Sequence, residues 1–424
     1  MGDFDDEFGD LAIPNCTLRW EVELPESTIA LALSPKEQLV AVGTVEDEIC
    51  LLDVATGEVK FRLAGHDGGT NAVAFLSGNT LVSAGEDGKT RVWNVGRQSC
   101  IHELAIDAVE PDTSPSGFSV SHLAVAPDAS SFAVAAGKSV VRFSLDSQQG
   151  PSAEPKRKAF PPLASTVEAL RFDRQGNLMA AYYGGVTYWD FSRTEEQRQA
   201  LDLPYQGACL SLDATPTADW VVAGCHDSSV HIYHFKRQEE AGVELEEMQC
   251  GGYEGKVTLV DFDRRGRHMA SAGGERNIVW DFSKTPAGSL PTLTFGHRKP
   301  ISCQGWQPDG DLLATGGRDG RIYLYDVADA MPNRDGPSMC LPGALADRMG
   351  DEVTQLRWAS NGRILAGYLS GFVRLWELPV AESSEEEEEE AEGTGSGDTA
   401  PAAAGSSSRE GAARSGTEAA AGSS

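Results

Sequence analysis

Eight short segments of similar character recur along this chain between residues 18 and 378. Each is a β-branched, alternating run that ends in an aromatic or apolar residue, an acidic or small polar residue, and another apolar residue. Successive segments end between 41 and 51 residues apart, and such a period is typical of repeat architectures. The segments are ICLLDV (49–54), TRVWNV (90–95), VVRFSL (140–145), VTYWDF (186–191), VHIYHF (230–235), NIVWDF (277–282), IYLYDV (322–327) and VRLWEL (373–378).

Two further strand-like runs precede each segment. In the second repeat they are NAVAF (71–75) and TLVSAG (80–85), and the turn EDGK then leads into TRVWNV. Short alternating runs bounded by Gly, Asp, Asn and Pro are typical of strands, and Asp-Gly favours tight hairpin turns because Gly tolerates positive φ. A fourth, less regular run follows most copies, such as VKFRLAG (59–65). Four antiparallel strands in about 45 residues predict a propeller blade.

The repeats resemble those of the WD-repeat β-propeller family over nearly all of residues 18–378. The resemblance implies an all-β propeller with a buried hydrogen-bond tetrad in the second and seventh repeats. The tetrad residues that it implies are His66, Ser83, Asp87 and Trp93, and His297, Thr315, Asp319 and Tyr325. The fourth and sixth repeats carry Trp189 and Trp280 without an Asp at the matching turn position, so they depart from this pattern.

We expect one propeller domain at residues 17–379, with eight blades. Seven blades are the alternative, with the divergent stretch 105–163 as the unit most easily miscounted. Only an acidic tail follows VRLWEL, and TLRWEVEL (17–24) precedes the first repeat as a lone strand. Pairing of this strand with the last blade would close the ring without leaving free sheet edges, which invite aggregation.

The charge of the chain is strongly negative, at −29, and it is unevenly distributed. Residues 1–16 are acidic and we expect them to be flexible. Residues 380–424 combine a glutamate run with Gly, Ser, Ala and Thr, so we expect a disordered tail. The acidic balance disfavours direct binding to nucleic acid or to a membrane. Because the acidic N-terminus lacks the basic residues of a targeting segment, we expect a cytoplasmic or nuclear protein.

Two serines in the tail are candidate phosphorylation sites. Ser383 and Ser384 stand directly before six glutamates, and each has Glu at its third following position. This arrangement resembles the acceptor sites of casein-kinase-two-type enzymes, whose basic groove favours downstream carboxylates. The sequence therefore predicts an acidic tail that becomes more negative when it is phosphorylated.

The eight cysteines are scattered, so we expect buried thiols rather than disulfides or a zinc ribbon. One stretch, with Cys225, His226, His231 and His234, contains soft and borderline metal ligands. Residues three apart on a strand point to opposite faces, so His231 and His234 cannot share a metal. Cys225 or His226 could meet His231 across the hairpin, which gives at most two ligands. We therefore expect no metal site and no cofactor.

Sequence motifs for catalysis are missing or incomplete. SAGEDGKT (83–90) lacks the first Gly of a phosphate-binding loop and leads into a strand rather than a helix, so it predicts a hairpin turn. The sequence contains no G-x-S-x-G or HExxH motif and no kinase signature. Trp189-Asp190-Phe191-Ser192-Arg193 places its Arg one position too late for the WD-x-R element of ubiquitin-ligase receptors. We expect a protein that is not an enzyme.

Charged loops supply the candidate partner-binding residues. In this family the turn between the second and third strands lies on the same face as the loop between blades. The residues expected there are Glu46, Asp47, Asp67 and Glu86 in the first two repeats, and Arg276, Arg298, Lys299 and Arg318 around the sixth and seventh. Opposed acidic and basic sectors would orient a protein partner.

We expect a non-enzymatic scaffold that holds other proteins on the faces of a propeller, itself monomeric within a larger complex. One alternative is an enzyme or small-ligand-binding propeller with its site at the mouth of the central channel. Others are a substrate receptor of a ubiquitin ligase and a subunit of a nucleic-acid-associated complex. The last depends on the basic sector and on Lys156-Arg157-Lys158, in a connection (146–163) that reads as an exposed loop.

Overall fold

The fold was established from a computed structural model. It describes residues 15–106, 119–145, 153–191, 200–238, 242–283, 290–333, 336–348, 350–359 and 362–379. Strands dominate this part of the chain, and η2 (Val327–Asp329) is a short 3-10 helical turn. None of the helices in these residues has the length and hydropathy that crossing a membrane requires. Residues 383 and 384, and the rest of the acidic tail, lie outside the described residues.

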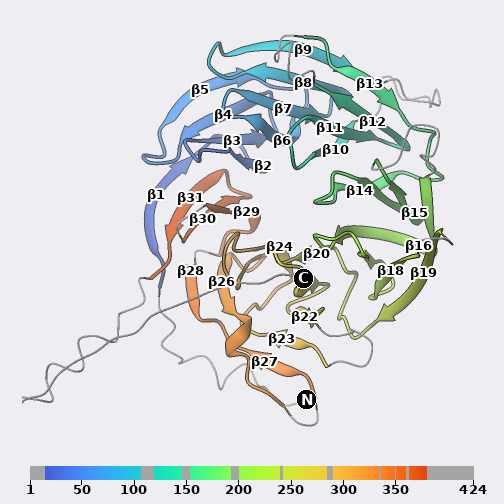
Figure 1. The fold of residues 1–424 in the computed structure, drawn as a ribbon. Coiled ribbons are helices and arrows are strands. Elements are labelled where there is room, and N and C mark those ends of the chain that lie inside the picture. The colour runs from blue at the N-terminus through green and yellow to red at the C-terminus, as the bar shows by residue number, and fades with distance from the viewer. Residues whose placement is uncertain are drawn as a thin grey trace, which may run out of the picture. The chain divides into compact units, whose positions relative to one another are not determined.

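The strands form seven hydrogen-bonded sheets, which follow one another around a ring (Figure 1). The first sheet comprises β2 (Thr28–Leu33), β3 (Leu39–Thr44), β4 (Glu48–Asp53) and β5 (Val59–Ala64). The second comprises β6 (Thr70–Ser77), β7 (Thr80–Gly85), β8 (Lys89–Asn94) and β9 (Ser99–Ala105). The third comprises β10 (Val120–Val125), β11 (Ser131–Ala136), β12 (Ser139–Ser144) and β13 (Lys156–Ala159).

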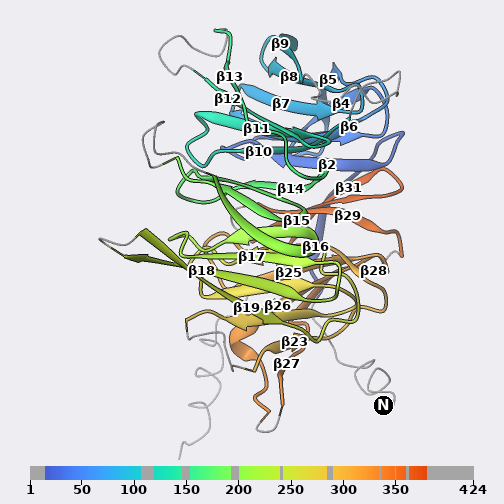
Figure 2. The same cartoon turned by 90° about the vertical axis from the view of Figure 1, so that its right-hand side faces the viewer.

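The remaining four sheets complete the ring, which Figure 2 shows from the side. The fourth comprises β14 (Val167–Phe172), β15 (Leu178–Trp189), β16 (Ala200–Ala214), β17 (Trp220–Cys225), β18 (Val230–Gln238) and β19 (Gly242–Cys250). The fifth comprises β20 (Leu259–Phe262), β21 (His268–Ala272), β22 (Asn277–Asp281), β23 (Thr292–Thr294) and β27 (Ser338–Cys340). The sixth comprises β24 (Ile301–Trp306), β25 (Leu312–Gly317), β26 (Arg321–Asp326) and β28 (Ala344–Arg348). The seventh comprises β29 (Val353–Ala359), β30 (Arg363–Tyr368), β31 (Phe372–Glu377) and β1 (Thr17–Glu23).

The expectation of eight separate blades is therefore wrong, because the fourth and fifth repeats share one six-stranded sheet. Strand β16 is continuous over 15 residues, and it serves as the outer strand of one repeat and the inner strand of the next. Its pairing changes partway: residues 200–208 face β15, whereas residues 209–214 face β17. The divergent stretch 105–163, where a miscount was expected, instead contributes to a sheet of its own.

The first and last parts of the ring are joined by β1, which pairs antiparallel with β31 from Thr17↔Glu377 to Glu23↔Phe372. In Figure 1 the blue β1 lies along the red β31. Trp20 of β1 packs in a hydrophobic cluster with Val40 of the first sheet and Leu365 of the seventh, and its Nε1–H donates to the Val54 carbonyl at 2.8 Å. The side chain of Trp20 thus bridges two neighbouring sheets.

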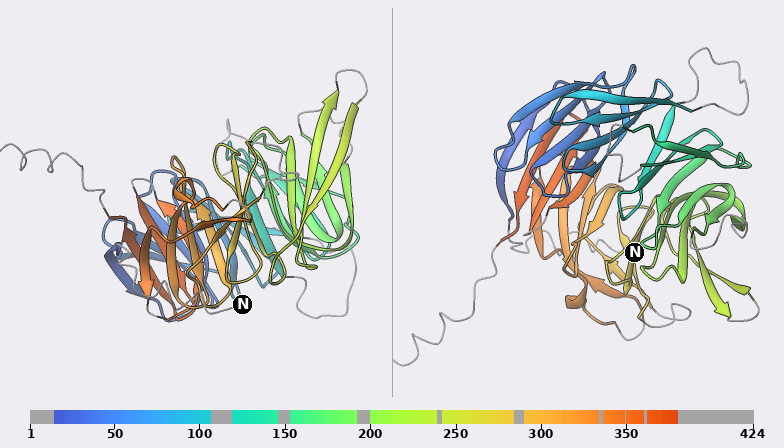
Figure 3. Two further views of the ribbon diagram at one scale, coloured as in Figure 1. Left: turned by 90° about the horizontal axis from the view of Figure 1, so that it is seen from below. Right: turned by 45° about the horizontal axis from the view of Figure 1, so that its top comes forward.

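Two connections differ from what the sequence pattern suggests. Lys156-Arg157-Lys158 does not lie in a loop, since β13 pairs these residues with β12 as the outer strand of the third sheet. The β18–β19 hairpin is longer than its counterparts, with strands of nine residues each, and it extends beyond its neighbours as the lime-coloured hairpin in Figure 3.

Candidate functional site

One face of the ring carries all eight of the charged candidate residues. The turns between second and third strands bond there to the loops between repeats: the Gly68 N–H donates to Asp47 Oδ1 at 3.1 Å, and the Arg298 N–H donates to Asp319 Oδ2 at 2.8 Å. We call this surface the loop face. It comprises residues 45–48, 65–69, 86–88, 273–276, 296–300 and 317–320. The antiparallel strands place the other two sets of turns on the opposite face.

The acidic part of the loop face comes from the first two sheets. Glu46, Asp47, Asp67 and Glu86 are all exposed. Repulsion from the Glu26 carboxylate raises the pKa of Glu46. These carboxylates therefore form a crowded anionic surface, which a cationic partner would relieve.

The basic residues of the loop face differ in whether they form ion pairs. Arg276 is half-buried, pairs with Glu254 at 3.8 Å, and lies over the Phe295 ring with its guanidinium carbon 4.7 Å from the centroid. Arg318 pairs with Glu352 at 3.4 Å. Arg298 and Lys299 are exposed, and within the described ranges neither has an ion-pair partner. Of the four basic candidates, these two are the ones available to a partner.

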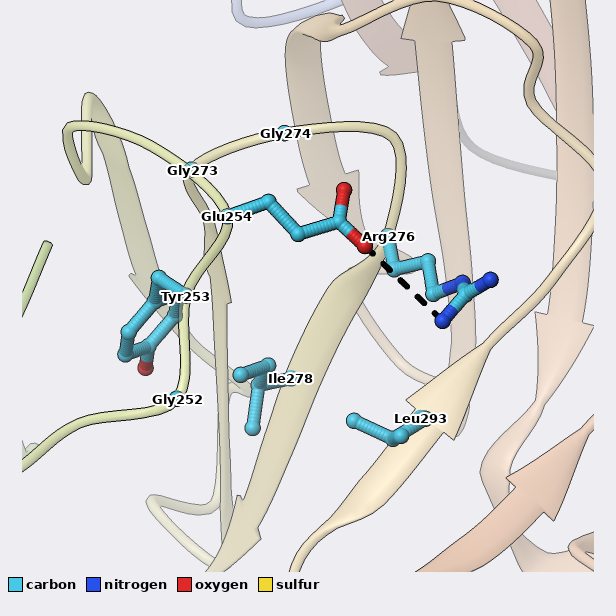
Figure 4. A pocket seen from close by; sticks show the side chains of 8 residues that line it. All are labelled: Gly252, Tyr253, Glu254, Gly273, Gly274, Arg276, Ile278 and Leu293. Atoms are coloured by element: carbon cyan, nitrogen blue, oxygen red, sulfur yellow. Dashed lines mark ion pairs between the residues drawn. The ribbon is translucent and has the colours of Figure 1, made fainter. Parts of the chain in front are cut away.

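Figure 4 shows the surroundings of Arg276, a cavity of about 50 Å³ whose wall includes Gly252, Gly273, Gly274, Ile278 and Leu293. The carboxylate of Glu254 points toward Arg276 there. The cavity has room for a water molecule or two and none for a larger ligand. Arg276 therefore contributes to the local structure of the fifth sheet.

The tetrad residues of the second repeat form a continuous chain of hydrogen bonds. His66 Nδ1 lies 2.8 Å from Asp87 Oδ1, His66 Nε2 lies 2.7 Å from Ser83 Oγ, and Trp93 Nε1–H donates to Ser83 Oγ at 2.8 Å. Burial lowers the pKa of His66 against the opposing effect of Asp87. Burial alone would raise the pKa of Asp87, but the hydrogen bond from His66 and the charge of Arg91 leave it below its usual value.

The seventh repeat contains a similar chain with one different connection. His297 Nδ1 lies 3.0 Å from Asp319 Oδ1, and His297 Nε2 lies 2.8 Å from Thr315 Oγ1. The Tyr325 hydroxyl, in the position of the tryptophan, donates to the Phe295 carbonyl at 2.9 Å. The tyrosine therefore connects the chain to the backbone of the preceding strand.

A third polar chain, which the sequence pattern did not reveal, lies in the sixth repeat. The Tyr253 and Ser271 hydroxyls are 2.5 Å apart, and Trp280 Nε1–H donates to the Tyr253 oxygen at 3.2 Å. Tyr253 thus stands where the second repeat has its histidine. A hydroxyl needs no carboxylate partner, which accounts for the absence of an Asp from the following turn. The Gly-Tyr pair at 252–253, in place of Gly-His, was the available signal.

Charged side chains also line one side of the central channel. Arg171 of β14 pairs with Asp213 of β16 at 3.2 Å and with Asp261 of β20 at 3.0 Å. Burial raises the pKa of Asp261 to about 6, with Asp213 adding to the effect and Arg171 opposing it. Arg357 occupies the same position on β29, and burial lowers its pKa.

The first three sheets instead have an alanine at this position of their inner strands. These residues are Ala32, Ala74 and Ala124. At these equivalent inner-strand positions, the charged residues described here belong to the fourth, fifth and seventh sheets. No sequence motif marks these residues.

A hollow of about 440 Å³ opens at the end of the channel opposite the loop face. Arg174, Arg264 and Trp306 contribute cationic and aromatic groups to its wall, and Asp261 contributes a carboxylate. The Arg174 guanidinium donates to the Asp263 carbonyl at 3.3 Å, so this side chain is partly held by the backbone. The hollow has the size and polarity to receive a charged side chain of a partner.

The fifth repeat brings three possible metal ligands together. One donor atom from each of Cys225, Asp227 and His231 lies within 4.8 Å of the other two. The expectation of at most two ligands is therefore wrong, because it overlooked Asp227 in the turn. His226 is exposed and is not part of the group, and His234 stacks on Trp220 with ring centroids 3.9 Å apart.

The remaining candidates are placed as follows. Residues 83–90 form the hairpin between β7 and β8, in which the Gly88 N–H donates to the Gly85 carbonyl at 3.3 Å. Five of the free cysteines lie buried on strands, whereas Cys100 is exposed and Cys250 is half-buried. Of the WD-x-R-like segment, Ser192 and Arg193 lie outside the described residues.

Comparison with known proteins agrees with the repeat pattern. The WD40 family profile, described as "WD domain, G-beta repeat", matches residues 57–94, 202–234 and 289–326. The chain is 27% identical over 314 residues to telomerase protein component 1 of Rattus norvegicus, with 71% of this chain and 11% of that protein covered. It is 23% identical over 358 residues to actin-interacting protein 1 of Caenorhabditis elegans, with 81% of this chain and 52% of that protein covered. The chain thus spans about a tenth and about half of these curated relatives.

Solved structures show the same fold at low sequence identity. Sqt1 from Chaetomium thermophilum superposes with a TM-score of 0.67 at 18% identity, covering 87% of this chain and 100% of that one. The computationally designed Ika8 protein superposes with a TM-score of 0.63 at 20% identity, covering 84% and 98%. The repeat profile, these relatives and the ring of antiparallel sheets lead to one conclusion: the chain contains WD40 repeats and is similar to WD-repeat proteins in sequence and fold.

Proposed function

We propose that this protein is a non-enzymatic scaffold that binds another protein through its loop face. The observation that carries the proposal is the pair of exposed cations, Arg298 and Lys299, which have no ion-pair partner in the described part of the chain. Their loop is fixed by the bond from the Arg298 N–H to Asp319, so the two charges are presented from a rigid backbone. A rigid loop loses little conformational entropy when a partner binds.

The expected partner surface is acidic opposite Arg298 and Lys299, and basic opposite Glu46 and Glu86. WD-repeat propellers generally bind proteins, which supports a protein partner over a small substrate. Complementary sectors on one face favour a single docking orientation and a fast, salt-dependent association. We further propose that the protein acts as a monomer within a larger assembly, in the cytoplasm or the nucleus.

Charge reversal tests the proposal. Affinity purification with the full chain as bait identifies the proteins that bind, and each is then measured with purified components. Arg298→Glu with Lys299→Glu should weaken binding at least tenfold, with a smaller difference at high salt. The control is Lys36→Glu with Arg97→Glu, which changes the net charge equally in turns on the opposite face. Equal binding by both variants and the wild type would show that Arg298 and Lys299 of the loop face do not contribute to partner binding.

A further inference from the structure

The sulfur atoms of two buried cysteines lie unusually close together in the fifth repeat. Cys209 on β16 is paired in register with Cys225 on β17, and their Sγ atoms are 3.7 Å apart. Both residues are fully buried. Two thiolates bound to one tetrahedral Zn²⁺, each at about 2.3 Å, stand about 3.8 Å apart. The observed separation therefore equals that of a pair of zinc ligands.

Strand register places His231 on the same face as the two thiols. His231 of β18 is paired with Ala223 of β17, which lies two residues before Cys225. Paired residues, and residues two apart on one strand, project to the same side of a sheet. Asp227 follows in the turn, and one donor atom from each of Cys225, Asp227 and His231 lies within 4.8 Å of the other two. Cys209 is not one of these three and adjoins them through its contact with Cys225.

The histidine ring has one nitrogen held and one nitrogen free. His231 Nδ1 lies 2.8 Å from Glu247 Oε1, whereas Nε2 is buried and has no hydrogen-bond partner among the described residues. His231 is only 6% exposed, so an unpaired nitrogen there carries a cost in free energy. A carboxylate that accepts from Nδ1–H fixes the tautomer in which Nε2 offers a lone pair, as it does behind many zinc-binding histidines.

The position that His231 occupies is also unusual among the repeats. The corresponding residues of the second and last repeats are Arg91 and Arg374, as their pairing partners on the second strands show. In the second repeat this arginine pairs with the turn aspartate, Asp87, at 2.8 Å. In the fifth repeat the aspartate, Asp227, remains, but it lies near a histidine, His231, and a thiol, Cys225.

We propose that Cys209, Cys225, Asp227 and His231 form a tetrahedral binding site for Zn²⁺. Two thiolates, an imidazole nitrogen and a carboxylate oxygen suit this borderline-soft ion and offer a poor site to Mg²⁺ or Ca²⁺. Each thiol gives up its proton to solvent when the metal binds. Zn²⁺ would join β16, β17 and the turn before β18, at the junction where two repeats share one sheet. Ser229 Oγ–H donates to Asp227 Oδ1 at 2.5 Å, and this bond helps to orient the carboxylate.

Cobalt substitution tests the site directly. The full chain is reduced, stripped of metal with a chelator, and titrated with Co²⁺. The expected result is saturation at one equivalent, with the intense visible absorption of tetrahedral, thiolate-ligated Co²⁺, and loss of that absorption when Zn²⁺ is added. A reduced and folded wild-type chain that shows neither Co²⁺ absorption nor a rise in melting temperature with Zn²⁺ would overturn the proposal.

Matched variants separate the site from adventitious binding. His231→Gln and Asp227→Asn should each weaken Co²⁺ binding at least tenfold, and Cys225→Ser should remove the thiolate absorption or shift it strongly. His234→Gln, on the opposite face of the same strand, and Cys303→Ser, in another sheet, should bind as the wild type does. Circular dichroism identifies any variant that fails to fold; Asp227 is exposed in a turn, so its variant keeps the test decisive.

Two adjacent glutamates test the role of the hydrogen bond between Glu247 and His231 Nδ1. Glu247 holds His231, whereas Glu246 pairs with Lys236 at 2.8 Å on the other face of the hairpin. Glu247→Gln should weaken metal binding by about 10- to 100-fold, and Glu246→Gln should leave it unchanged. Equal affinity of these two variants, or retention of wild-type affinity by His231→Gln, would exclude His231 as a ligand.

Discussion

At the scale of single residues, the stability of the second repeat depends on a buried chain of hydrogen bonds. Each polar side chain in it is the hydrogen-bond partner of the next. Removal of the Asp87 carboxylate leaves His66 Nδ1 without its acceptor in a fully buried position. A buried group left unpaired costs about 1–3 kcal/mol. We therefore expect Asp87→Ala to lower the free energy of unfolding by about that amount. Chemical denaturation measures it.

The control for this variant is Asp128→Ala. Asp128 lies in the exposed turn between β10 and β11, where its carboxylate accepts from the Ser130 backbone N–H at 3.0 Å. A surface change of this kind alters stability by about 0.5 kcal/mol or less. Equal destabilisation by the two variants would mean that the chain from His66 to Trp93 adds nothing to stability.

The same chain makes stability depend on pH in a definite direction. His66 has a lowered pKa in the fold because burial disfavours its charged form, so the unfolded chain takes up a proton first as the pH falls. Stability is therefore present above the ordinary pKa of histidine, near 6.5, and is lost below it. The lowered pKa of Asp87 adds a loss of the same sign at more acidic pH.

His66→Gln tests this dependence. Removal of the titrating ring should make the loss of stability between pH 7 and pH 5 shallower than in the wild type, although the variant is less stable at pH 7. Melting temperatures across that range provide the measurement. Parallel curves for the two proteins would show that the loss of stability arises from other groups. The half-buried His122, whose pKa is also lowered by desolvation, is one of them.

Residue-scale prediction from the sequence succeeded in some places and failed in others for physical reasons. His66, Ser83, Asp87 and Trp93 were recognisable because their spacing follows from strand register. Tyr253 was missed because the motif specifies a histidine at this position. A tyrosine hydroxyl can occupy the same place and form a hydrogen bond with Ser271, but a motif defined by residue type does not include it. Asp227 was missed as a candidate ligand because it lies in the turn, and only residues around the two strands were compared as ligands.

At the scale of elements, the strand pattern predicted the third strands well but not where one sheet ends. The turn at Gly184-Gly185 is so tight that β15 runs from Leu178 to Trp189, and both glycines have positive φ, at 125° and 135°. A Cβ on Gly185 would lie 2.1 Å from the Leu203 carbonyl oxygen. Hydrophobic periodicity carries no information about such a backbone path, so it does not show that the second and third strands of the fourth repeat are continuous as β15. The shared sheet was missed because β16 likewise continues from one repeat into the next.

The contribution of strand β1 to the stability of the ring can be measured directly. Trp20 is buried between the first and seventh sheets, whereas Leu18 on the same strand is 41% exposed. Loss of a buried tryptophan side chain costs about 3–5 kcal/mol. We expect Trp20→Ala to lower the melting temperature strongly and Leu18→Ala to change it little. A small effect of Trp20→Ala would show that β1 is not needed to hold the two sheets together.

At the scale of the whole molecule, the acidic residues are distributed so that the two ends of the chain carry much of the net charge of −29. The net charge of the protein repels anions, whereas the exposed cations Arg298 and Lys299 attract them locally. We expect those two cations to attract an acidic partner. The acidic tail is suited instead to a basic surface of a partner, and phosphorylation would increase its negative charge.

Phosphorylation of Ser383 and Ser384 is the prediction that follows from the sequence of the acidic tail. Each phosphate adds about −1.5 to −2 charges at pH 7, and the six glutamates that follow provide the acidic surroundings that an acidophilic kinase requires. We expect such a kinase to modify the full chain at these serines, as mass spectrometry would show, and not the Ser383→Ala/Ser384→Ala variant.

The consequence for binding has a definite sign. We expect the anionic tail to attract a basic surface of a partner, so phosphorylation should strengthen capture of that partner and deletion of residues 380–424 should weaken it. Both effects should shrink as salt is added, because screening reduces attraction between exposed charges. The Ser383→Ala/Ser384→Ala variant should show no change in affinity after treatment with the kinase. An unmodified tail, or a deletion that leaves affinity unchanged at low salt, would limit the tail to increasing solubility.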